Sequence, residues 1–321
     1  MPDGRLVVAG SYNLDMITEV KLLPRPGETV IGSSVSYSHG GKGANQVLAA
    51  NQFLQGHRES GKGLSFIGAV GQDEAGQRFT RYLQALAIDT TYLHDLPGSR
   101  TGMAQILVDQ IGENSIVVSP EANYQLTPED AADSLAGIGD IALLLVQFEI
   151  PLKTAIHLIE SMKDQKGLVV VNPAPAFPLQ DKVFASIDVL TPNLSELALL
   201  TGKHDFSDRA EIQQAASELI TKGVGHVVVT MGSEGVLYVS GEGSQFFPSN
   251  EVKAVDTSGA GDCFNGVFAA ALVSGFAMEE AIRQGMLYAA LSVTRKGTSI
   301  SYPDAQEVKS FAEKMLQKES F

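Results

Sequence analysis

Residues 256–262, Asp-Thr-Ser-Gly-Ala-Gly-Asp, run directly into an apolar segment with helical spacing that extends to Ser274. Small residues let a phosphate approach the backbone, and the first N–H groups of a helix have no partner within it and carry partial positive charge. Gly259, Ala260 and Gly261 are therefore predicted to face an anion. Asp262 adds a carboxylate at the same helix start, where it can accept a proton from a bound hydroxyl.

The helix dipole alone also explains an Asp near a helix N-terminus. Capping does not explain why Gly-Ala-Gly precedes Asp262, or why a second acidic residue, Asp256, lies six residues upstream. The spacing favours a site for phosphoryl transfer, with Asp262 as base and the glycine turn as anion hole.

Short β-branched runs alternate with amphipathic segments along most of the chain. The runs read as buried strands and the amphipathic segments as helices. Expected strands are 6–9, 64–70, 141–147, 168–172, 187–190 and 227–230. Expected helices are 42–54, 74–86, 128–135, 151–162, 195–201, 209–222, 262–274 and 278–294. This order predicts an α/β fold with a mostly parallel sheet, whose ligands gather at the carboxyl ends of the strands.

Two segments break the alternation, because 15–38 and 102–119 contain alternating residues and turn signals without a helical pattern. In the second, Ala104, Ile106 and Val108 alternate with polar residues. Both segments are predicted to form an antiparallel accessory sheet inserted into the α/β body. Edge hairpins without a role are the alternative.

The composition excludes several classes of protein. Of 321 residues, 44% are hydrophobic, which is enough for a large core, and the net charge of -14 would repel nucleic acid and anionic membranes. The single Cys263 cannot form an intrachain disulfide, and no apolar run reaches the roughly 20 residues of a membrane span. The apolar run near the start, residues 6–9, is too short for a signal peptide, so we expect a cytoplasmic protein.

A second glycine cluster, Gly-Gly-Lys-Gly-Ala-Asn at 40–45, leads into a predicted helix. Lys42 and Asn45 fall within its first turn, where they could grip sugar hydroxyls and neutralise phosphate. A tight turn with an exposed lysine explains the cluster equally well in isolation. Asn13 and Asp15 lie two apart after the first strand, so they could hydrogen-bond adjacent hydroxyls, or form an Asx turn.

Two familiar nucleotide motifs are absent. Residues 10–15 follow the first strand without the Gly-x-Gly-x-x-Gly pattern, which disfavours a dinucleotide fold. Residues 56–62 imitate the start of a P-loop, but Gly63 replaces its Ser or Thr and a strand follows where a helix is required. We expect a surface loop at 56–63.

Two further polar turns follow predicted strands. Asn193 and Glu196 open a helix after 187–190, where they could cap the helix or position magnesium through its waters. Residues 230–235, Thr-Met-Gly-Ser-Glu-Gly, could approach nucleotide phosphates or simply form a hairpin turn.

The whole chain resembles the ribokinase branch of the PfkB carbohydrate kinase family. Five motifs occur in the order that this branch shows. They are Gly-Ser-x-Asn-x-Asp at 10–15, Gly-Gly-Lys-Gly-Ala-Asn at 40–45, Asn-Pro-Ala-Pro-Ala at 172–176, Thr-Pro-Asn at 191–193 and Asp-Thr-Ser-Gly-Ala-Gly-Asp at 256–262. The resemblance implies one kinase domain over 1–321, with a three-layer α/β/α fold and an inserted lid from about 13–40 and 101–119 that pairs two subunits.

The resemblance also implies the reaction, which is phosphorylation of D-ribose at O5 by MgATP, with Asp262 as base and Gly259, Ala260 and Gly261 as anion hole. The implied sugar site is Asn13, Asp15, Gly41, Lys42, Gly43, Asn45, Glu149 and Asp262. The implied ATP contacts are Asn193, Thr230, Gly232, Ser233, Gly235, Gly261 and Met286, and Asn193 with Glu196 would organise Mg²⁺ through water. An activating monovalent cation such as K⁺ would bind at Asp256, Ser258, Ser292, Arg295, Gly297 and Ser301.

Two departures are Met286, where relatives often place His or Asn near the adenine, and the long 56–63 loop. Alternatives within the class are kinases for deoxyribose, fructose or a nucleoside. A non-catalytic sugar-binding regulator is the alternative from another class.

Overall fold

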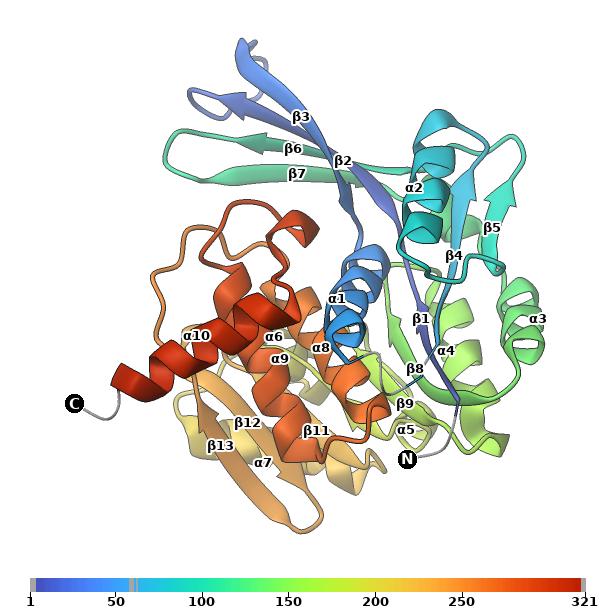
Figure 1. The fold of residues 1–321 in the computed structure, drawn as a ribbon, viewed down its shortest axis with the longest axis vertical. Coiled ribbons are helices and arrows are strands. Elements are labelled where there is room, and N and C mark those ends of the chain that lie inside the picture. Colours follow the sequence, from blue (N-terminus) through green and yellow to red (C-terminus); the bar gives the residue numbers. More distant parts are fainter. Residues whose placement is uncertain (1–3, 58–60, 62, 319–321) are drawn as a thin grey trace.

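The computed structural model describes residues 4–57, 61 and 63–318, and its centre is a nine-stranded sheet (Figure 1). The strand order is β13-β12-β11-β10-β9-β8-β1-β4-β5. The strands are β1 (Arg5–Ala9), β4 (Leu64–Gly71), β5 (Leu93–Leu96), β8 (Ile141–Gln147), β9 (Leu168–Asn172), β10 (Val189–Leu190), β11 (His226–Thr230), β12 (Gly235–Ser240) and β13 (Gly243–Pro248). Neighbours pair in parallel from β5 to β11, and only β12 and β13 are antiparallel.

Helices cover both faces of this sheet, which confirms the predicted three-layer fold. One hydrophobic cluster packs helices α1 (Lys42–Gly56), α2 (Glu74–Ala85), α8 (Ala260–Val273), α9 (Met278–Ser292) and α10 (Ala305–Lys318) against one face. The other packs α3 (Pro128–Ile138), α4 (Leu152–Ser161), α5 (Asp181–Phe184), α6 (Leu194–Thr201) and α7 (Arg209–Thr221) against the opposite face. The central strands β4 and β8 are buried along their whole length, as the apolar runs in their sequences require.

Side-chain caps begin several of these helices. Asp73 and Asp208 accept hydrogen bonds from backbone N–H groups at the starts of α2 and α7. Thr127 and Asn193 form capping boxes at α3 and α6, the latter with Glu196 as predicted. α8 differs, because its N-cap is Gly259 and no side chain caps it.

A separate four-stranded sheet projects from the body (Figure 1). We call it the accessory sheet, and its order is β3-β2-β6-β7, with β2 (Asn13–Val20), β3 (Gly32–Gly40), β6 (Gly102–Val108) and β7 (Asn114–Ser119). The prediction of an inserted sheet is confirmed, but a purely antiparallel sheet was wrong, because β2 and β6 pair in parallel. β2 follows β1 and β6 follows β5, two parallel strands of the main sheet, so both leave its carboxyl edge in the same direction.

The predicted strands and helices all form, with small shifts at their ends. α8 begins at Ala260 rather than at Asp262, so Asp262 is its third helical residue. The short strand β5, the antiparallel strands β12 and β13, and the helices α5 and α10 were not predicted. The expected 56–63 loop lies partly outside the described residues. Within the described part of the chain, no helix is long and apolar enough to span a membrane.

Candidate active site

The turn before α8 presents unpaired backbone N–H groups. Gly259 has a φ of 73°, in the left-handed region that favours glycine, and the helix starts directly after it. The N–H groups of Gly259, Gly261 and Asp262 have no hydrogen-bond acceptor among the described residues, whereas Ala260 N–H donates to the Thr257 carbonyl at 3.3 Å. Three N–H groups therefore remain for a ligand at the positive end of the helix dipole.

The Asp262 carboxylate lies beside this turn and is held by two side-chain amides of α1. Asn45 Nδ2 donates to its Oδ2 and Gln46 Nε2 to its Oδ1, each at 2.9 Å, and only 7% of Asp262 is exposed. Gln46 is itself fixed, because its Nε2 also donates to Asn172 Oδ1 and its Oε1 accepts a 2.6 Å bond from Gln147 Nε2. The carboxylate therefore has a defined orientation before any ligand binds.

The predicted glycine cluster positions α1 against the end of β1. Gly41 has a φ of 86°, and a Cβ on Gly43 would lie 2.5 Å from the Gly10 carbonyl carbon, so neither position accommodates another residue without displacement. This close approach brings the first turn of α1 to the carboxyl edge of the sheet. The Asn45 side chain is 6% exposed, and its Oδ1 has no partner within the described residues, so it can accept from a ligand hydroxyl.

Three more of the predicted sugar-binding residues lie near α1, where the accessory sheet joins the body. Glu149 Oε2 accepts hydrogen bonds from Ser11 Oγ at 2.5 Å and from Lys42 N at 2.9 Å. Asn13 Oδ1 accepts a bond from Asn123 Nδ2. Burial, and the nearby charge of Glu149, raise the pKa of Asp15 to about 7. The carboxylates of Asp15 and Glu149 are therefore close enough for their charges to interact, and both can accept hydrogen bonds from hydroxyl groups.

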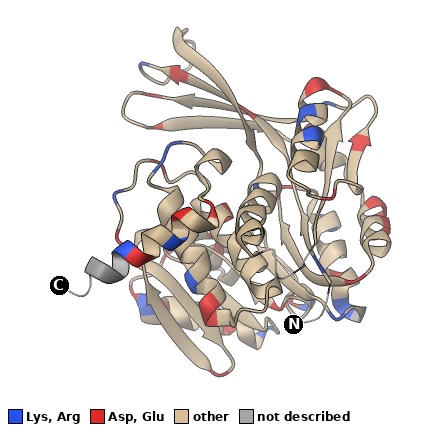
Figure 2. Ribbon diagram, in the orientation of Figure 1, with Lys and Arg blue, Asp and Glu red and all other residues tan. Residues whose placement is uncertain are grey.

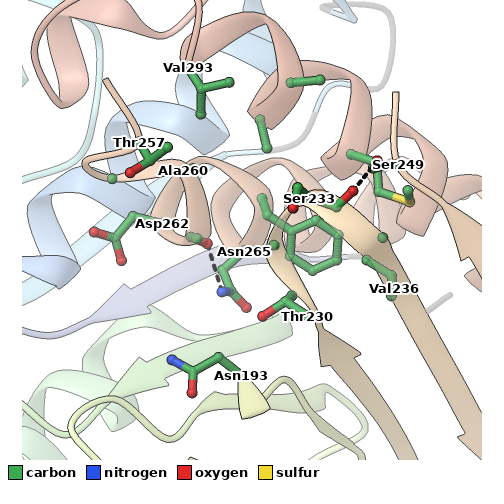
Figure 3. A pocket seen from close by; sticks show the side chains of 18 of the residues that line it. Asn193, Thr230, Ser233, Val236, Ser249, Thr257, Ala260, Asp262, Asn265 and Val293 are labelled. Carbon is green, nitrogen blue, oxygen red and sulfur yellow. Dashed lines mark hydrogen bonds between the residues drawn. The ribbon is translucent and has the colours of Figure 1, made fainter. Parts of the chain in front are cut away.

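A cavity of about 790 Å³ opens on the other side of Asp262 (Figure 3). Its lining contains the predicted nucleotide contacts Asn193, Thr230, Gly232, Ser233, Gly235, Gly261 and Met286, together with Lys42, Glu196 and Asp262. Asn13, Asp15, Gly41, Asn45 and Glu149 are not part of this lining. The structure therefore divides the predicted residues into those that line the cavity and those that lie beside α1 and β2. Asp262 touches both groups, because it lines the cavity and accepts a hydrogen bond from Asn45.

The cavity has a polar end and an apolar end. Around Asp262, the charge of that carboxylate raises the pKa of Lys42, and Lys42 Nζ forms no salt bridge in the described part of the chain. Away from Asp262, the lining is mostly apolar, with residues Val236, Val252, Ala254, Met286, Ala289, Ala290 and Val293. A cation beside unpaired N–H groups suits phosphate groups, and an apolar slot suits the planar ring of a nucleobase.

Residues 3–305 match the profile of the pfkB family of carbohydrate kinases. The chain belongs to that family. It is 39% identical to the ribokinase of Haemophilus influenzae over 96% of this chain and 98% of that protein. It is 36% identical to the deoxyribokinase of Salmonella typhi over 94% of this chain and 96% of that protein.

Solved structures agree with this membership of the pfkB family. The ribokinase of Thermotoga maritima has a TM-score of 0.85 and 35% identity, covering 97% of this chain and all of that chain. The Arabidopsis thaliana ribokinase complexed with ribose and ATP has a TM-score of 0.84 and 28% identity, covering 96% and 98%. The fold of this chain is therefore shared with solved structures of ribokinases.

The residues of the predicted cation site in this pfkB kinase lie around one loop. Asp256 Oδ1 accepts from Ser258 N and Oδ2 from Gly297 N, both at 2.9 Å. Burial alone would raise the pKa of Asp256, but these hydrogen bonds outweigh it and the pKa lies below its usual value. The Arg295 guanidinium instead pairs with Glu307, so only its backbone could serve a cation. Ser292 and Ser301 are both buried, and each hydroxyl donates to a backbone carbonyl.

No set of three or more His, Cys, Asp or Glu side chains forms a metal cluster within residues 4–57, 61 and 63–318. Asn193 and Glu196 cap α6 with each other, as one of the two predicted readings required. Glu196 also lines the cavity, and burial together with the charge of Asp262 raises its pKa despite the opposing charge of Lys42.

Sequence reasoning missed Gln46, which donates to Asp262, and Gln147, which holds Gln46 in place. Gln46 and Gln147 are fully buried, and they lie 101 residues apart in the sequence. The only available signal was a glutamine at the carboxyl end of an apolar strand and another inside a predicted helix, both among apolar neighbours.

Proposed function

We propose that this protein transfers the γ-phosphoryl group of ATP to O5 of D-ribose, giving D-ribose 5-phosphate and ADP. The observation that carries the proposal is the position of Asp262, which lies between the nucleotide-sized cavity and the hydroxyl-binding group. A base at this point can reach a sugar hydroxyl on one side while the N–H groups of its own helix face a phosphate on the other.

In this reaction Asp262 accepts the proton of the attacking hydroxyl as the new O–P bond forms and the bond to the ADP oxygen breaks. The unpaired N–H groups of Gly259, Gly261 and Asp262 at the start of α8 stabilise charge on the transferring group, with Lys42 as the nearby cation. The Ala260 N–H, which the sequence pattern also assigned to the anion hole, is instead paired with the Thr257 carbonyl. Because Asn45 and Gln46 already fix the carboxylate, little reorganisation accompanies the transfer.

The sugar would be held by Asn13, Asp15, Gly41, Lys42, Gly43, Asn45 and Glu149. Support comes from their acceptor-rich side chains, because each hydroxyl of a free sugar can donate to a carboxylate or amide oxygen. ATP would lie in the cavity, with its phosphates toward Thr230, Gly232, Ser233 and Gly235 and its base beside Met286.

Two cations are part of this proposal. The unpaired Glu196 carboxylate oxygen and Asn193 line the cavity, and they suit Mg²⁺ held through water. When bound, Mg²⁺ would neutralise phosphate charge. The 256–258 and 292–301 segments suit a monovalent ion, K⁺ by our proposal, through backbone carbonyls, because Asp256 already anchors the two segments to each other. With ATP as a substrate, we also propose that the enzyme works in the cytoplasm.

We further propose that the chain is one kinase domain and that the accessory sheet closes over the sugar as a lid and pairs two subunits. The sheet carries apolar side chains that are at least 50% exposed, namely Val35, Tyr37, Ile116, Val117 and Val118. Charged residues gather mainly on the outer helices, and few lie on this sheet (Figure 2). Sedimentation should show a dimer that Val117→Lys dissociates, and a monomeric parent would contradict the pairing.

A coupled assay of ADP release across a panel of sugars tests the proposed function. The panel contains D-ribose, 2-deoxy-D-ribose, D-fructose and a nucleoside, each with MgATP. We expect the highest kcat/KM with D-ribose. Higher kcat/KM with 2-deoxy-D-ribose would assign the activity of the Salmonella relative instead, and sugar binding without ADP release would indicate a non-catalytic regulator.

A further inference from the structure

Tyr302 lies behind the anion-binding turn rather than in the cavity. It follows the 3₁₀ turn η5 (Ser299–Ser301), and only 4% of it is exposed. Its hydroxyl donates a 3.0 Å hydrogen bond to the carbonyl oxygen of Gly259. Gly259 is the left-handed residue that immediately precedes α8.

The Gly259 carbonyl fixes the peptide plane between Gly259 and Ala260, because its C=O and the Ala260 N–H belong to one planar unit. The Ala260 N–H is already paired with the Thr257 carbonyl, and the unpaired N–H groups of Gly259 and Gly261 flank this plane on its two sides. Glycine populates more backbone conformations than any other residue, so a glycine turn needs external contacts to stay in one of them. Two donors provide these contacts. Cys263 N–H bonds the Gly259 carbonyl at 2.8 Å from within the helix, and the Tyr302 hydroxyl bonds it from outside.

The segment that carries Tyr302 also holds the opposite end of the same loop. Gly297 N donates to Asp256 Oδ2 at 2.9 Å. Thr298 covers the turn as well, because a Cβ on Gly259 would lie 2.3 Å from its Cγ2 and 2.8 Å from the Tyr302 hydroxyl. Residues 297–302 therefore clamp the 256–262 loop at its first residue and at its left-handed turn.

We propose that Tyr302 is a positioning residue that holds the peptide N–H groups at the start of α8 in place for the transferring phosphoryl group. It acts through Gly259 and does not line the cavity. This inference rests on the proposed phosphotransferase function and assigns to one hydroxyl the task of keeping the anion hole preorganised. Its loss weakens binding of the transition state more than binding of either substrate.

Tyr302→Phe removes that single oxygen and keeps the buried ring. The Gly259 carbonyl retains the bond from Cys263, so the variant is expected to fold. Loss of one hydrogen bond predicts a fall in kcat of about three- to tenfold. KM for ribose and ATP should stay within about twofold of the parent. The affinity of ADP with aluminium fluoride, measured with ribose and Mg²⁺ present, should fall by a factor similar to kcat.

Tyr288→Phe is the matched control. Tyr288 is 1% exposed, and its hydroxyl has no hydrogen-bond partner among the residues that the structure describes. Removing that hydroxyl is expected to leave kcat, both KM values and the affinity for ADP with aluminium fluoride unchanged. Thermal unfolding of both variants separates a change in the turn from a general loss of stability.

The inference is overturned if Tyr302→Phe retains a kcat within twofold of the parent, if its fluoride affinity is unchanged, or if Tyr288→Phe loses as much. An increase in KM with kcat unchanged would also overturn it, since the hydroxyl would then act in ground-state binding. A parent protein without ribose-dependent ADP release would instead reject the proposed function, and this inference with it. If the parent protein is active and Tyr302→Phe is as active as the parent, only the inference about Tyr302 is rejected and the proposed function stands.

Discussion

Two buried carboxylates of the proposed sugar site, Asp262 and Asp15, differ in how many hydrogen bonds the fold gives them. Asp262, in the first turn of α8, accepts a hydrogen bond on each oxygen from Asn45 and Gln46. Asp15, in β2 at the root of the accessory sheet, accepts no hydrogen bond from the described residues, although it too is only 7% exposed. Burial and the charge of Glu149 raise the pKa of Asp15 to about 7.

Asp262 therefore has its hydrogen-bond donors before any ligand binds, whereas Asp15 would obtain donors only from a bound ligand. The bonds to Asp262 make its orientation independent of the substrate, as preorganised catalysis requires. A buried carboxylate without donors is costly, and sugar hydroxyls would supply the missing donors. We therefore expect substitution of Asp262 to lower kcat, and substitution of Asp15 to change the free energy of unfolding.

The largest effect is expected for Asp262→Asn, which keeps the side-chain shape and removes the base. General-base catalysis contributes about 10²- to 10⁴-fold, so kcat should fall by this factor. KM for ATP should change little. The coupled ADP-release assay measures both, and near-native turnover in the variant would reject Asp262 as the base.

Asp15→Asn should stabilise the ligand-free protein at high pH. In the fold Asp15 keeps its proton up to about pH 7, whereas in the unfolded chain it ionises near 3.8. The folded state therefore binds more protons between these values, and the free energy of unfolding falls as pH rises through them. The pKa difference corresponds to about 4 kcal/mol, fully expressed above pH 7. Urea unfolding of parent and variant at pH 5 and pH 8 measures it, and a difference independent of pH would contradict the account.

Gln46→Met should leave Asp262 with fewer hydrogen-bond donors, as is already the case for Asp15. It removes one of the two hydrogen bonds to Asp262, together with the bonds of Gln46 to Asn172 and Gln147, while keeping the length of the buried side chain. A hydrogen bond to a charged group contributes about 1.5–3 kcal/mol, so kcat should fall by about ten- to a hundredfold. Gln55→Met on the exposed face of the same helix is the control, with kcat expected to equal that of the parent. Equal activities would indicate that Gln46 does not hold the base.

The smallest effect is expected at the cation loop. We expect kcat several-fold higher in potassium than in sodium buffer for the parent. Asp256→Asn should reduce this ratio, because the carboxylate joins the 256–258 segment to Gly297. Assays at matched ionic strength give the ratio, and a parent equally active in both buffers would remove the cation site from the account.

Much of this arrangement could be predicted from local patterns. The glycine turns at 40–43 and 259–261 and the apolar strands follow from nearest neighbours in the sequence. The contact between Gln46 and Gln147 could not, because it depends on how α1 packs over β8. The direction of β6 beside β2 was also beyond reach, since alternation of side chains is the same in parallel and antiparallel strands. The lack of a donor for Asp15 became visible only in three dimensions.

The ratio of D-ribose 5-phosphate formed to ADP released is the most direct test of the central claim. That claim is that the prepositioned Asp262 takes the proton from the sugar hydroxyl, so that the phosphoryl group of ATP passes to the sugar and not to water. Phosphorus NMR of a reaction with limiting ATP measures both products. We predict one D-ribose 5-phosphate for each ADP. ADP and inorganic phosphate without sugar phosphate, or phosphate on another oxygen of ribose, would contradict the account.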